Sequence, residues 1–200
     1  MINPFAPKIY TRSGITKENI FSNKKVLHIG CGSSKLRGAL GMDILKLPGV
    51  DLVHNLDETP WPVEDSSVDL VFAHSVVEHL SDIVSFTDEV WRVLKPGGRV
   101  IITVPYFRSV DSFTDITHKH FFTSKSFDYF IKNSGQLSEY TYTEKTFRKI
   151  GFWYGWPHES KNPLVFMFKK FIQNHRRFYD QYLSLLFPMR ILIWELEVDK

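Results

Sequence analysis

The stretch VLHIGCG at Val26–Gly32 joins a short apolar segment to two glycines. An apolar segment of this kind is typical of a strand that is buried on both faces of a parallel sheet. Ligands of such sheets bind beyond the carboxyl ends of the strands, which is where Gly30 and Gly32 stand. Glycine lets the backbone turn tightly and approach a ligand, while the amides of the following turn face that ligand. We therefore expect a nucleotide-like cofactor here, although an ordinary turn between a strand and a helix can have the same two glycines.

Outward from this stretch, strand-like and helix-like segments alternate. Further apolar, β-branched segments that predict strands lie at Gly38–Ile44, Asp51–His54, Val68–His74 and Arg99–Pro105, and the first strand is expected at Lys24–Ile29. The clearest helix covers Asp82–Leu94, and Pro96-Gly97-Gly98 ends it. This alternation predicts an α/β fold, a Rossmann-like, doubly wound and mostly parallel sheet. Only ten residues separate Gly32 from Asp43, fewer than a crossover helix needs, so we expect the first helix to be shortened to about one turn.

The second half of the chain is expected to add to this core. A helix is predicted at Ser124–Asn133, and one or two extended segments are predicted within Glu139–Trp153. Leu164–Phe187 has apolar residues at helical spacing opposite lysines and arginines, which predicts an amphipathic helix. Ile191–Val198 is expected to form a final antiparallel strand at the sheet edge.

Composition limits the architecture and the chemistry. We interpret 1–200 as a single domain with a cofactor-binding core at 24–135, followed by edge strands and an amphipathic lid helix at 136–200. Cys31 is the only cysteine, which excludes an internal disulfide and a cysteine-based zinc site within the chain. No segment reaches the roughly 18 to 20 apolar residues of a membrane span, and no signal pattern is present at the start, so we expect a cytoplasmic protein.

Positive charge is concentrated toward the C-terminus. The formal net charge is +3, yet residues 145–190 contain nine Lys or Arg against Glu159 and Asp180. The basic face of Leu164–Phe187 could rest on an anionic membrane surface. The alternative is a lid that packs on the sheet and exposes a solvated basic face.

Asp43 adds a second element to the glycine turn. It falls where a second parallel strand would end beside the first, so its carboxylate would face the same crevice and could accept hydrogen bonds from both ribose hydroxyls. The third glycine of the dinucleotide fingerprint is absent, and Lys35 stands in its place. A mononucleoside ligand therefore fits better than a dinucleotide.

Five blocks of sequence resemble the class I S-adenosylmethionine-dependent methyltransferases of the broad kind called methyltransferase type 11. The resemblance covers Lys24–Phe130 and rests on these blocks in this order: HIGCG at 28–32, GMD at 41–43, WPVEDSSVD at 61–69, SVVEHL at 75–80 and EVWRVLKPGG at 89–98. It implies S-adenosylmethionine as the cofactor and S-adenosylhomocysteine as its product.

The resemblance also implies roles for individual residues. Gly30, Cys31 and Gly32 would line the methionine end of the cofactor, Asp43 would hold the ribose, Asn55 and Leu56 would meet the adenine, and Ala73 and His74 would flank the methionine moiety. The chain departs from the family pattern at His28, where an acidic residue is usual. It departs again at Asn55, where the adenine-contacting Asp is usual, unless that Asp is displaced to Asp57.

Catalytic groups are expected on the loop beyond the fifth strand. Methyl transfer is an in-line displacement in which a protein supplies orientation and, where needed, a base for the acceptor. Asp115, His118 and His120 lie together in a segment rich in aromatic residues, and histidine titrates near neutrality, so we predict these three as the catalytic residues. The alternative is that the two histidines cap or brace the next helix.

Glu78-His79 is similar to a paired Glu-His that serves as a metal site in some quinone O-methyltransferases. The further upstream carboxylate of that site is Ser75 here, so we expect no metal and a helix-initiating role for the pair.

We therefore predict that the protein methylates a hydroxyl on a small molecule or a glycan. One alternative is a non-catalytic, cofactor-binding module that acts with a partner protein. Another is a nucleic-acid methyltransferase, but the amino-methylating motif is absent where Ala73-His74-Ser75-Val76 stands, so no nucleic-acid partner is expected.

Overall fold

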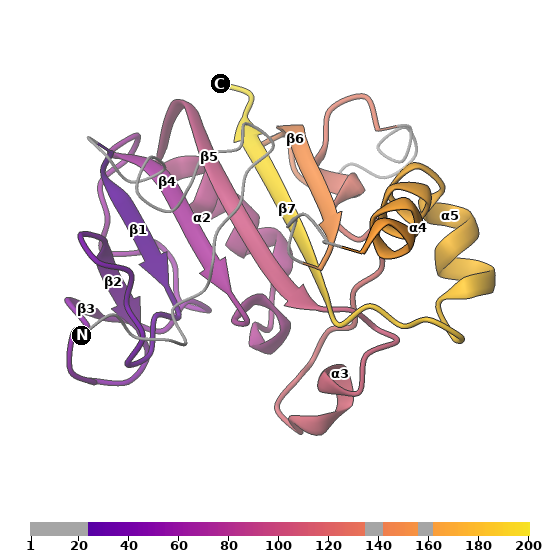
Figure 1. Ribbon diagram of the computed structural model, residues 1–200. Helices are drawn as coiled ribbons and strands as arrows, with labels where there is room; N and C mark the ends of the chain where they lie inside the picture. The colour runs from indigo at the N-terminus through magenta and orange to yellow at the C-terminus, as the bar shows by residue number, and fades with distance from the viewer. Residues whose placement is uncertain (1–23, 135–141, 156–161) are drawn as a thin grey trace.

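The computed structural model describes residues 24–134, 142–155 and 162–200, and is built around one sheet of seven strands (Figure 1). The strand order is β3-β2-β1-β4-β5-β7-β6, in which the first five positions are parallel and β7 is antiparallel to both of its neighbours. The strands are β1 Val26–Ile29, β2 Leu40–Asp43, β3 Leu52–Val53, β4 Val68–His74, β5 Leu94–Pro105, β6 Phe147–Tyr154 and β7 Ile191–Val198. The predicted α/β class and parallel core are confirmed.

The helix predicted at Asp82–Leu94 forms as α2, Ile83–Val93. The Asp82 carboxylate caps it by accepting hydrogen bonds from the backbone N–H groups of Val84 and Ser85. Phe86, Val90 and Val93 are buried on the face that packs against the sheet. The other helical elements are η1 Val77–His79, α3 Asp111–Thr114, η2 Asp128–Phe130, α4 Pro163–Asn174, α5 Arg176–Phe178 and a π-helical turn, η3, at Tyr179–Leu183.

The connection from β1 to β2 forms turns where the sequence predicted a single helical turn. The backbone N–H of Leu36 donates to Nδ1 of the buried His28, at 3.1 Å, instead of to a helical carbonyl. His28 thus holds the connection against the end of β1. This explains why a histidine can stand where the family usually has an acidic residue.

The final strand matches its predicted bounds and direction, but it lies one position inside the sheet edge because β6 pairs with its outer side. Glu195 and Glu197 give β7 the polar alternation of an exposed strand. Arg99 on β5 binds both carboxylates, with Nη1 2.8 Å from Glu195 and Nε 2.9 Å from Glu197. These ion pairs let charged residues occupy an interior strand.

Two helix predictions in the second half were wrong in extent. Only η2 forms within 124–133, where backbone N–H groups donate to the carbonyl three residues earlier, as from Asp128 to Lys125 and from Phe130 to Phe127, instead of four residues earlier as in an α-helix. The helix expected at 164–187 is interrupted at His175, whose φ of −120° and ψ of 49° lie outside the helical range. The predicted segment of 139–153 that falls on 139–141 lies outside the described residues.

Asp180 fastens this helical segment to the sheet. Its Oδ1 accepts the hydroxyl protons of Tyr106, at 2.8 Å, and of Tyr154, at 2.6 Å. These tyrosines stand just beyond β5 and at the end of β6, so a single carboxylate joins three parts of the chain. Burial raises the pKa of both hydroxyls above the usual tyrosine range, which keeps them protonated as donors.

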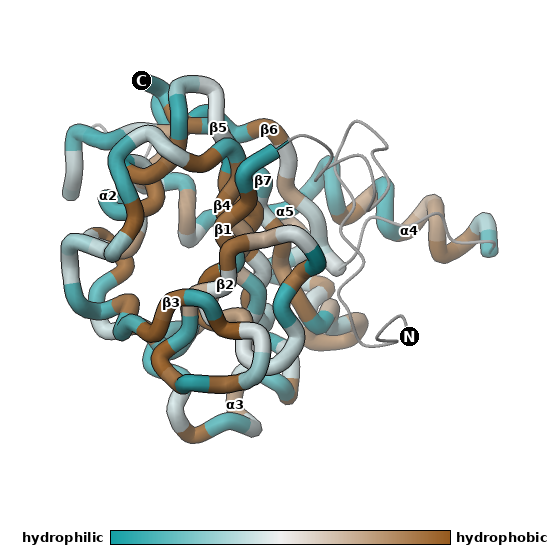
Figure 2. The backbone as a smooth tube through the Cα atoms, turned by 90° about the vertical axis from the view of Figure 1, so that its left-hand side faces the viewer, coloured by the Kyte–Doolittle hydropathy of each residue, from teal (hydrophilic) through white to brown (hydrophobic). Residues whose placement is uncertain are grey.

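Apolar residues are concentrated in the strands at the centre of the molecule, with hydrophilic loops around them (Figure 2). The larger core cluster lies between α2 and the sheet and continues to Trp194 and Tyr179, while a smaller one joins Val26, Phe72 and Ile193. Within the described ranges, no helix is long and apolar enough to cross a membrane.

Candidate functional site

Three parallel strands end side by side at the lower edge of the sheet in Figure 1. Ile29 of β1 pairs with Met42 of β2 and with Ala73 of β4. The next residue of each strand, Gly30, Asp43 and His74, therefore comes to the same level of the carboxyl edge. This is the edge at which open α/β sheets bind their ligands.

Gly30 and Gly32 perform different tasks in the turn. Both have left-handed backbone conformations, with φ of 59° and 50°. A Cβ on Gly30 would lie 2.5 Å from Cγ2 of Val76, so this glycine is required by packing within the protein. A Cβ on Gly32 would meet no atom within 4 Å, so this glycine faces open space. Gly32 is thus the position where a ligand can come close to the backbone.

Asp43 is bound directly to this turn. Its Oδ2 accepts a hydrogen bond from the backbone N–H of Gly32 at 2.7 Å, and its Oδ1 accepts one from Leu45 at 2.9 Å. A carboxylate has about four acceptor positions, so one further position remains on each oxygen. Two free acceptor positions on a carboxylate held against the glycine turn fit the two hydroxyls of a ribose. Ile44 and Val53, next to and paired with Asp43, are 60% and 54% exposed and offer an apolar surface that suits a base.

The residues predicted to meet adenine follow β3 at the same edge. The Asn55 amide is engaged locally, since its Oδ1 accepts from the backbone N–H of Asp57 at 3.1 Å and its Nδ2 donates to Glu58 at 3.2 Å. Leu56 is buried. Asp57 instead binds the backbone N–H and hydroxyl of Ser81, both at 2.8 Å. Asp57 therefore joins this loop to the segment after η1, which argues against a displaced adenine ligand at that position.

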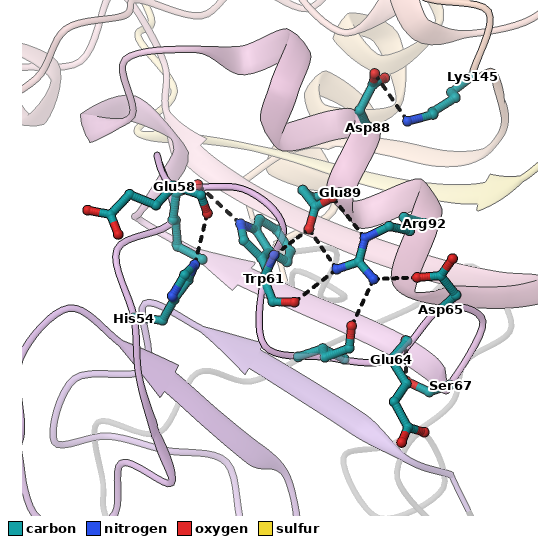
Figure 3. A network of polar contacts seen from close by, with 12 residues as sticks. His54, Glu58, Trp61, Glu64, Asp65, Ser67, Asp88, Glu89, Arg92 and Lys145 are labelled. Carbon is teal, nitrogen blue, oxygen red and sulfur yellow. Dashed lines mark hydrogen bonds and ion pairs between the residues drawn. The ribbon is translucent and has the colours of Figure 1, made fainter.

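Two of the sequence blocks that resemble the methyltransferases meet in a polar network (Figure 3). The Arg92 guanidinium donates to the carboxylate of Glu89 at 2.8 and 2.7 Å and to the backbone carbonyls of Val63 and Trp61 at 2.8 and 3.1 Å. Glu89 also accepts the backbone N–H of Trp61 at 2.7 Å, and Arg92 binds Asp65 at 2.5 Å. The network fixes the loop between β3 and β4 on α2, so these blocks position the loop and supply no reactive group to the edge.

Burial sets the protonation of three groups around the turn. It lowers the pKa of His28 to about 4, with the nearby His74 as the second cause, and the neutral ring accepts from Leu36 as described above. Burial also lowers the pKa of His74, which is therefore uncharged near neutrality. Burial and the charge of Asp43 raise the pKa of the Cys31 thiol, so Cys31 is a poor nucleophile.

The predicted catalytic residues lie together with Glu78 and His79, because the loop that carries them folds back on η1. The backbone N–H groups of Lys119 and His120 donate to the backbone carbonyl of Glu78, at 2.8 and 3.3 Å. His118 and His79 meet with ring centroids 4.7 Å apart. Asp115 accepts from both the backbone N–H and the hydroxyl of Thr117, which lowers its pKa. His120 is half-exposed, and its buried Nε2 has no hydrogen-bond partner among the described residues.

Glu78 is the least expected member of this group. Its side chain is 1% exposed, and within the described part of the chain neither carboxylate oxygen has a hydrogen-bond partner. Burial raises its pKa to about 7. An acidic side chain in this state is uncommon in a folded protein and calls for a compensating cation or proton.

A cavity of about 560 Å³ opens beside His74 at the carboxyl edge. Its walls come from the ends of β4 and β5, from α3 and α4, and from the start of β7, through His74, Ser75, Pro105, Asp111, Gly155, Lys169, Pro188, Met189, Arg190 and Ile191. Asp111, Lys169 and Arg190 were not predicted as site residues from the sequence. The basic cluster near the C-terminus was a signal for two of them, but only the antiparallel return of β7 brings Arg190 to this edge.

Comparisons with known proteins agree with this geometry. Residues 27–102 match the family model described as a methyltransferase domain. A probable S-adenosylmethionine-dependent methyltransferase of Mycolicibacterium smegmatis is 35% identical over 42% of this chain and 39% of that protein. Residues 27–102 therefore have the sequence of a methyltransferase domain, and the two matches support a class I S-adenosylmethionine-dependent methyltransferase. The family implies S-adenosylmethionine as the cofactor of this domain, and the open backbone at Gly32 and the acceptor positions on Asp43 fit it.

Solved methyltransferase structures have a fold similar to that of most of this chain. A methyltransferase from Archaeoglobus fulgidus covers 88% of this chain and 87% of its own, with a TM-score of 0.55 and 16% identity. A putative methyltransferase from Haloferax volcanii, solved in complex with the Trm112 activator, covers 88% and 82%, with a TM-score of 0.52 and 15% identity. At these identities the likeness shows the fold alone. The chain spans well under half the length of the curated M. smegmatis relative.

Proposed function

We propose that this chain transfers the methyl group of S-adenosylmethionine to a hydroxyl of a small molecule or glycan. The observation that supports this most directly is the cavity beside His74, since it adjoins the edge where Gly30, Gly32 and Asp43 are gathered. A cofactor along that edge and an acceptor in the cavity would lie on either side of the end of β4. Holding the two reactants in line is the main contribution that a protein makes to such a displacement.

The charges in the cavity favour an acceptor with an anionic group. Lys169 has no ion-pair partner among the described residues, and Arg190 pairs with Asp111 at 3.0 Å while its side chain stays 81% exposed. One carboxylate therefore faces two cations. We propose that a phosphate or carboxylate of the acceptor binds Lys169 and Arg190, which leaves a hydroxyl of the acceptor toward His74.

The cofactor contacts are part of the same proposal. Gly30, Cys31 and Gly32 would line the methionine end, Asp43 would bind the ribose, Asn55 and Leu56 would border the adenine, and Ala73 and His74 would flank the methionine moiety. Because the Asn55 side chain already binds Asp57 and Glu58, its contact with the base would come from its backbone. The assignment of Asp115, His118 and His120 as catalytic residues remains a prediction, and none of the three is a wall residue of the cavity.

Methyl transfer is tested with radiolabelled S-adenosylmethionine and a panel of hydroxylated acceptors, sugar phosphates and phenolic acids beside their uncharged counterparts. We expect label in the charged acceptors and S-adenosylhomocysteine as the second product. Lys169→Ala should raise the acceptor KM and leave S-adenosylhomocysteine affinity unchanged, while His118→Ala should abolish turnover with the same unchanged affinity. Cofactor binding without turnover on any acceptor would instead favour a non-catalytic module that acts with a partner protein.

We also propose that residues 164–187 contact an anionic membrane surface. The lid interpretation accounts for only part of this segment, since Ile172 and Tyr179 are buried while most other apolar residues are exposed, namely Leu164, Val165, Phe166, Met167, Phe171, Phe178, Tyr182, Leu185, Leu186 and Phe187. In Figure 2, α4 projects beyond the sheet. Lys170, Arg176 and Arg177 lie among these residues and complement anionic lipids.

Cosedimentation with phosphatidylglycerol vesicles at low salt tests this contact. We expect binding that weakens at high salt and that is lost when Leu185 and Leu186 are both replaced by Ser. Equal binding to phosphatidylcholine vesicles, or none to either, would contradict it. The cytoplasmic location and the absence of a nucleic-acid partner stay predictions.

A further inference from the structure

Glu78, His79 and His118 form a cluster that the cofactor edge does not use. Each offers one potential ligand atom, and these atoms all lie within 4.8 Å of one another. Glu78 and His79 belong to η1, whereas His118 comes from the loop after α3. Their meeting depends on the backbone hydrogen bonds that Lys119 and His120 donate to the Glu78 carbonyl. The cluster is therefore built by two separate segments of the chain.

Hydrogen bonds fix which nitrogen of His118 is available. Its Nδ1 lies 2.9 Å from the backbone carbonyl of Ser112, which can only accept, so Nδ1 carries the proton. The neutral ring then has its lone pair on Nε2. A histidine that donates one N–H to a backbone carbonyl and presents the other nitrogen is the usual arrangement of a metal ligand.

The same reasoning applies to His79 through a hydroxyl. Thr117 donates its only hydroxyl proton to Asp115 at 2.7 Å, so its oxygen accepts from Nδ1 of His79, 2.8 Å away. The two hydrogen bonds that link the Asp115 carboxylate, the Thr117 hydroxyl and the His79 imidazole orient the ring and leave Nε2 of His79 unprotonated. Asp115 and Thr117 thereby support His79 without belonging to the cluster.

Three acceptors now face one another without a donor. Both oxygens of the buried Glu78 lack a hydrogen-bond partner among the described residues. The nearest lysine on the loop, Lys119, turns away and binds the hydroxyl of Ser81 at 2.7 Å. Bonds from a metal to nitrogen or oxygen ligands are about 2.0 to 2.2 Å, so ligands of one ion lie at most about 4.4 Å apart. The observed spacing needs only a small rotation of the side chains to match.

We propose that Glu78, His79 and His118 bind one divalent transition-metal ion of the Zn²⁺ type. Two neutral imidazoles and one carboxylate are the donor set that such ions prefer, and three protein ligands leave a position open for water or substrate. This site includes Glu78 and His79, where the sequence analysis expected no metal, and His118, which also remains a predicted catalytic residue. The inference concerns binding of the ion, and it stands apart from the proposed methyl transfer because its test uses no methyl acceptor.

Equilibrium dialysis of the full chain, freed of metal by a chelator, against Zn²⁺ tests the proposal, with metal content read by elemental analysis. We expect one ion per chain and a rise in melting temperature on binding. Glu78→Gln and His118→Asn should each weaken Zn²⁺ binding by about tenfold or more, and Thr117→Val, which removes the support of His79, should weaken it by about the same factor. His120→Asn is the matched control from the same loop and should bind Zn²⁺ like the unaltered chain.

The metal-free stability of Glu78→Gln distinguishes loss of the site from loss of the fold. Since Gln removes a buried carboxylate without a partner, this variant should be at least as stable as the unaltered chain without metal, yet gain nothing from Zn²⁺. Equal Zn²⁺ binding by the unaltered chain and Glu78→Gln, or no saturable binding by the unaltered chain, would overturn the proposal. The second result would mean that Glu78 is buried with a proton.

Discussion

Replacing His28 by Asn should flatten the acid end of the stability profile. Burial lowers the pKa of His28 to about 4 in the folded chain from 6.5 in the absence of structure. Between pH 6.5 and 4, His28 is protonated in the unfolded chain but neutral in the folded chain. The contribution of His28 to the free energy of unfolding is therefore fully present above pH 6.5 and is lost as the pH falls toward 4. A difference of about 2.5 pH units corresponds to roughly 3 kcal/mol in total, of which about 2 kcal/mol is lost between pH 7 and pH 5.

The Asn variant is a matched control because its Oδ1 can still accept the N–H of Leu36 while the side chain no longer titrates. Urea unfolding at pH 7, 6 and 5, followed by circular dichroism, gives the free energy of unfolding of both chains. The unaltered chain should lose about 2 kcal/mol more than the variant between pH 7 and pH 5. Parallel profiles for the two chains would refute the account of His28 as a buried, neutral acceptor.

The remaining predictions concern the glycine turn and the network on α2. Gly32→Ala should lower the free energy of unfolding by only about 1 to 2 kcal/mol, because alanine is strained in the left-handed backbone conformation of this residue. Calorimetry should show a loss of S-adenosylhomocysteine affinity larger than this strain explains, and unchanged affinity would mean that no ligand approaches the turn. Gly30→Ala should destabilise the fold by about 1 to 3 kcal/mol beyond the backbone strain, because the new Cβ would clash with Val76. The double variant Gly30→Ala, Val76→Ala should regain part of that loss in urea unfolding, and no recovery would count against the predicted clash. Arg92→Ala should lower the free energy of unfolding by about 3 to 5 kcal/mol because it leaves the mostly buried Glu89 carboxylate without its cation, and a loss below about 1 kcal/mol would show that the network is solvated.

The cofactor half was predictable because its signals are local. The apolar segment before Gly30, the spacing to Asp43 and the helical pattern of Asp82–Leu94 each depend on residues that are neighbours along the chain, and the structure has strands and a helix at these positions. Boundaries followed for the same reason, as at Val68–His74, which forms a strand with the predicted ends.

The second half was less predictable because distant partners determine it. The hydroxyl of Ser124 binds Asp180, 56 residues away, and the segment after Ser124 forms turns and η2 where the local pattern favours an α-helix. Glu195 appears solvent-facing in the sequence but pairs with Arg99 on a strand that lies 96 residues earlier. The proximity of His118 to Glu78 was also not predictable, because residues this far apart in sequence give no local signal of contact. Periodicity indicates the secondary structure that a segment would favour on its own, whereas the structure of these segments is determined by contacts with residues far away in the sequence.

The antiparallel return of β7 has a consequence for how this chain could change over time. Because β7 starts at the edge where β5 ends, with Pro105 opposite Ile191, residues 188–190 border the cavity although they are far in sequence from the glycine turn. The two halves of the site are thus encoded by separate stretches that share only the strand between them. Substitutions near the C-terminus can alter what enters the cavity while leaving the Gly32–Asp43 contact untouched, so relatives with the same first hundred residues can differ in what they modify.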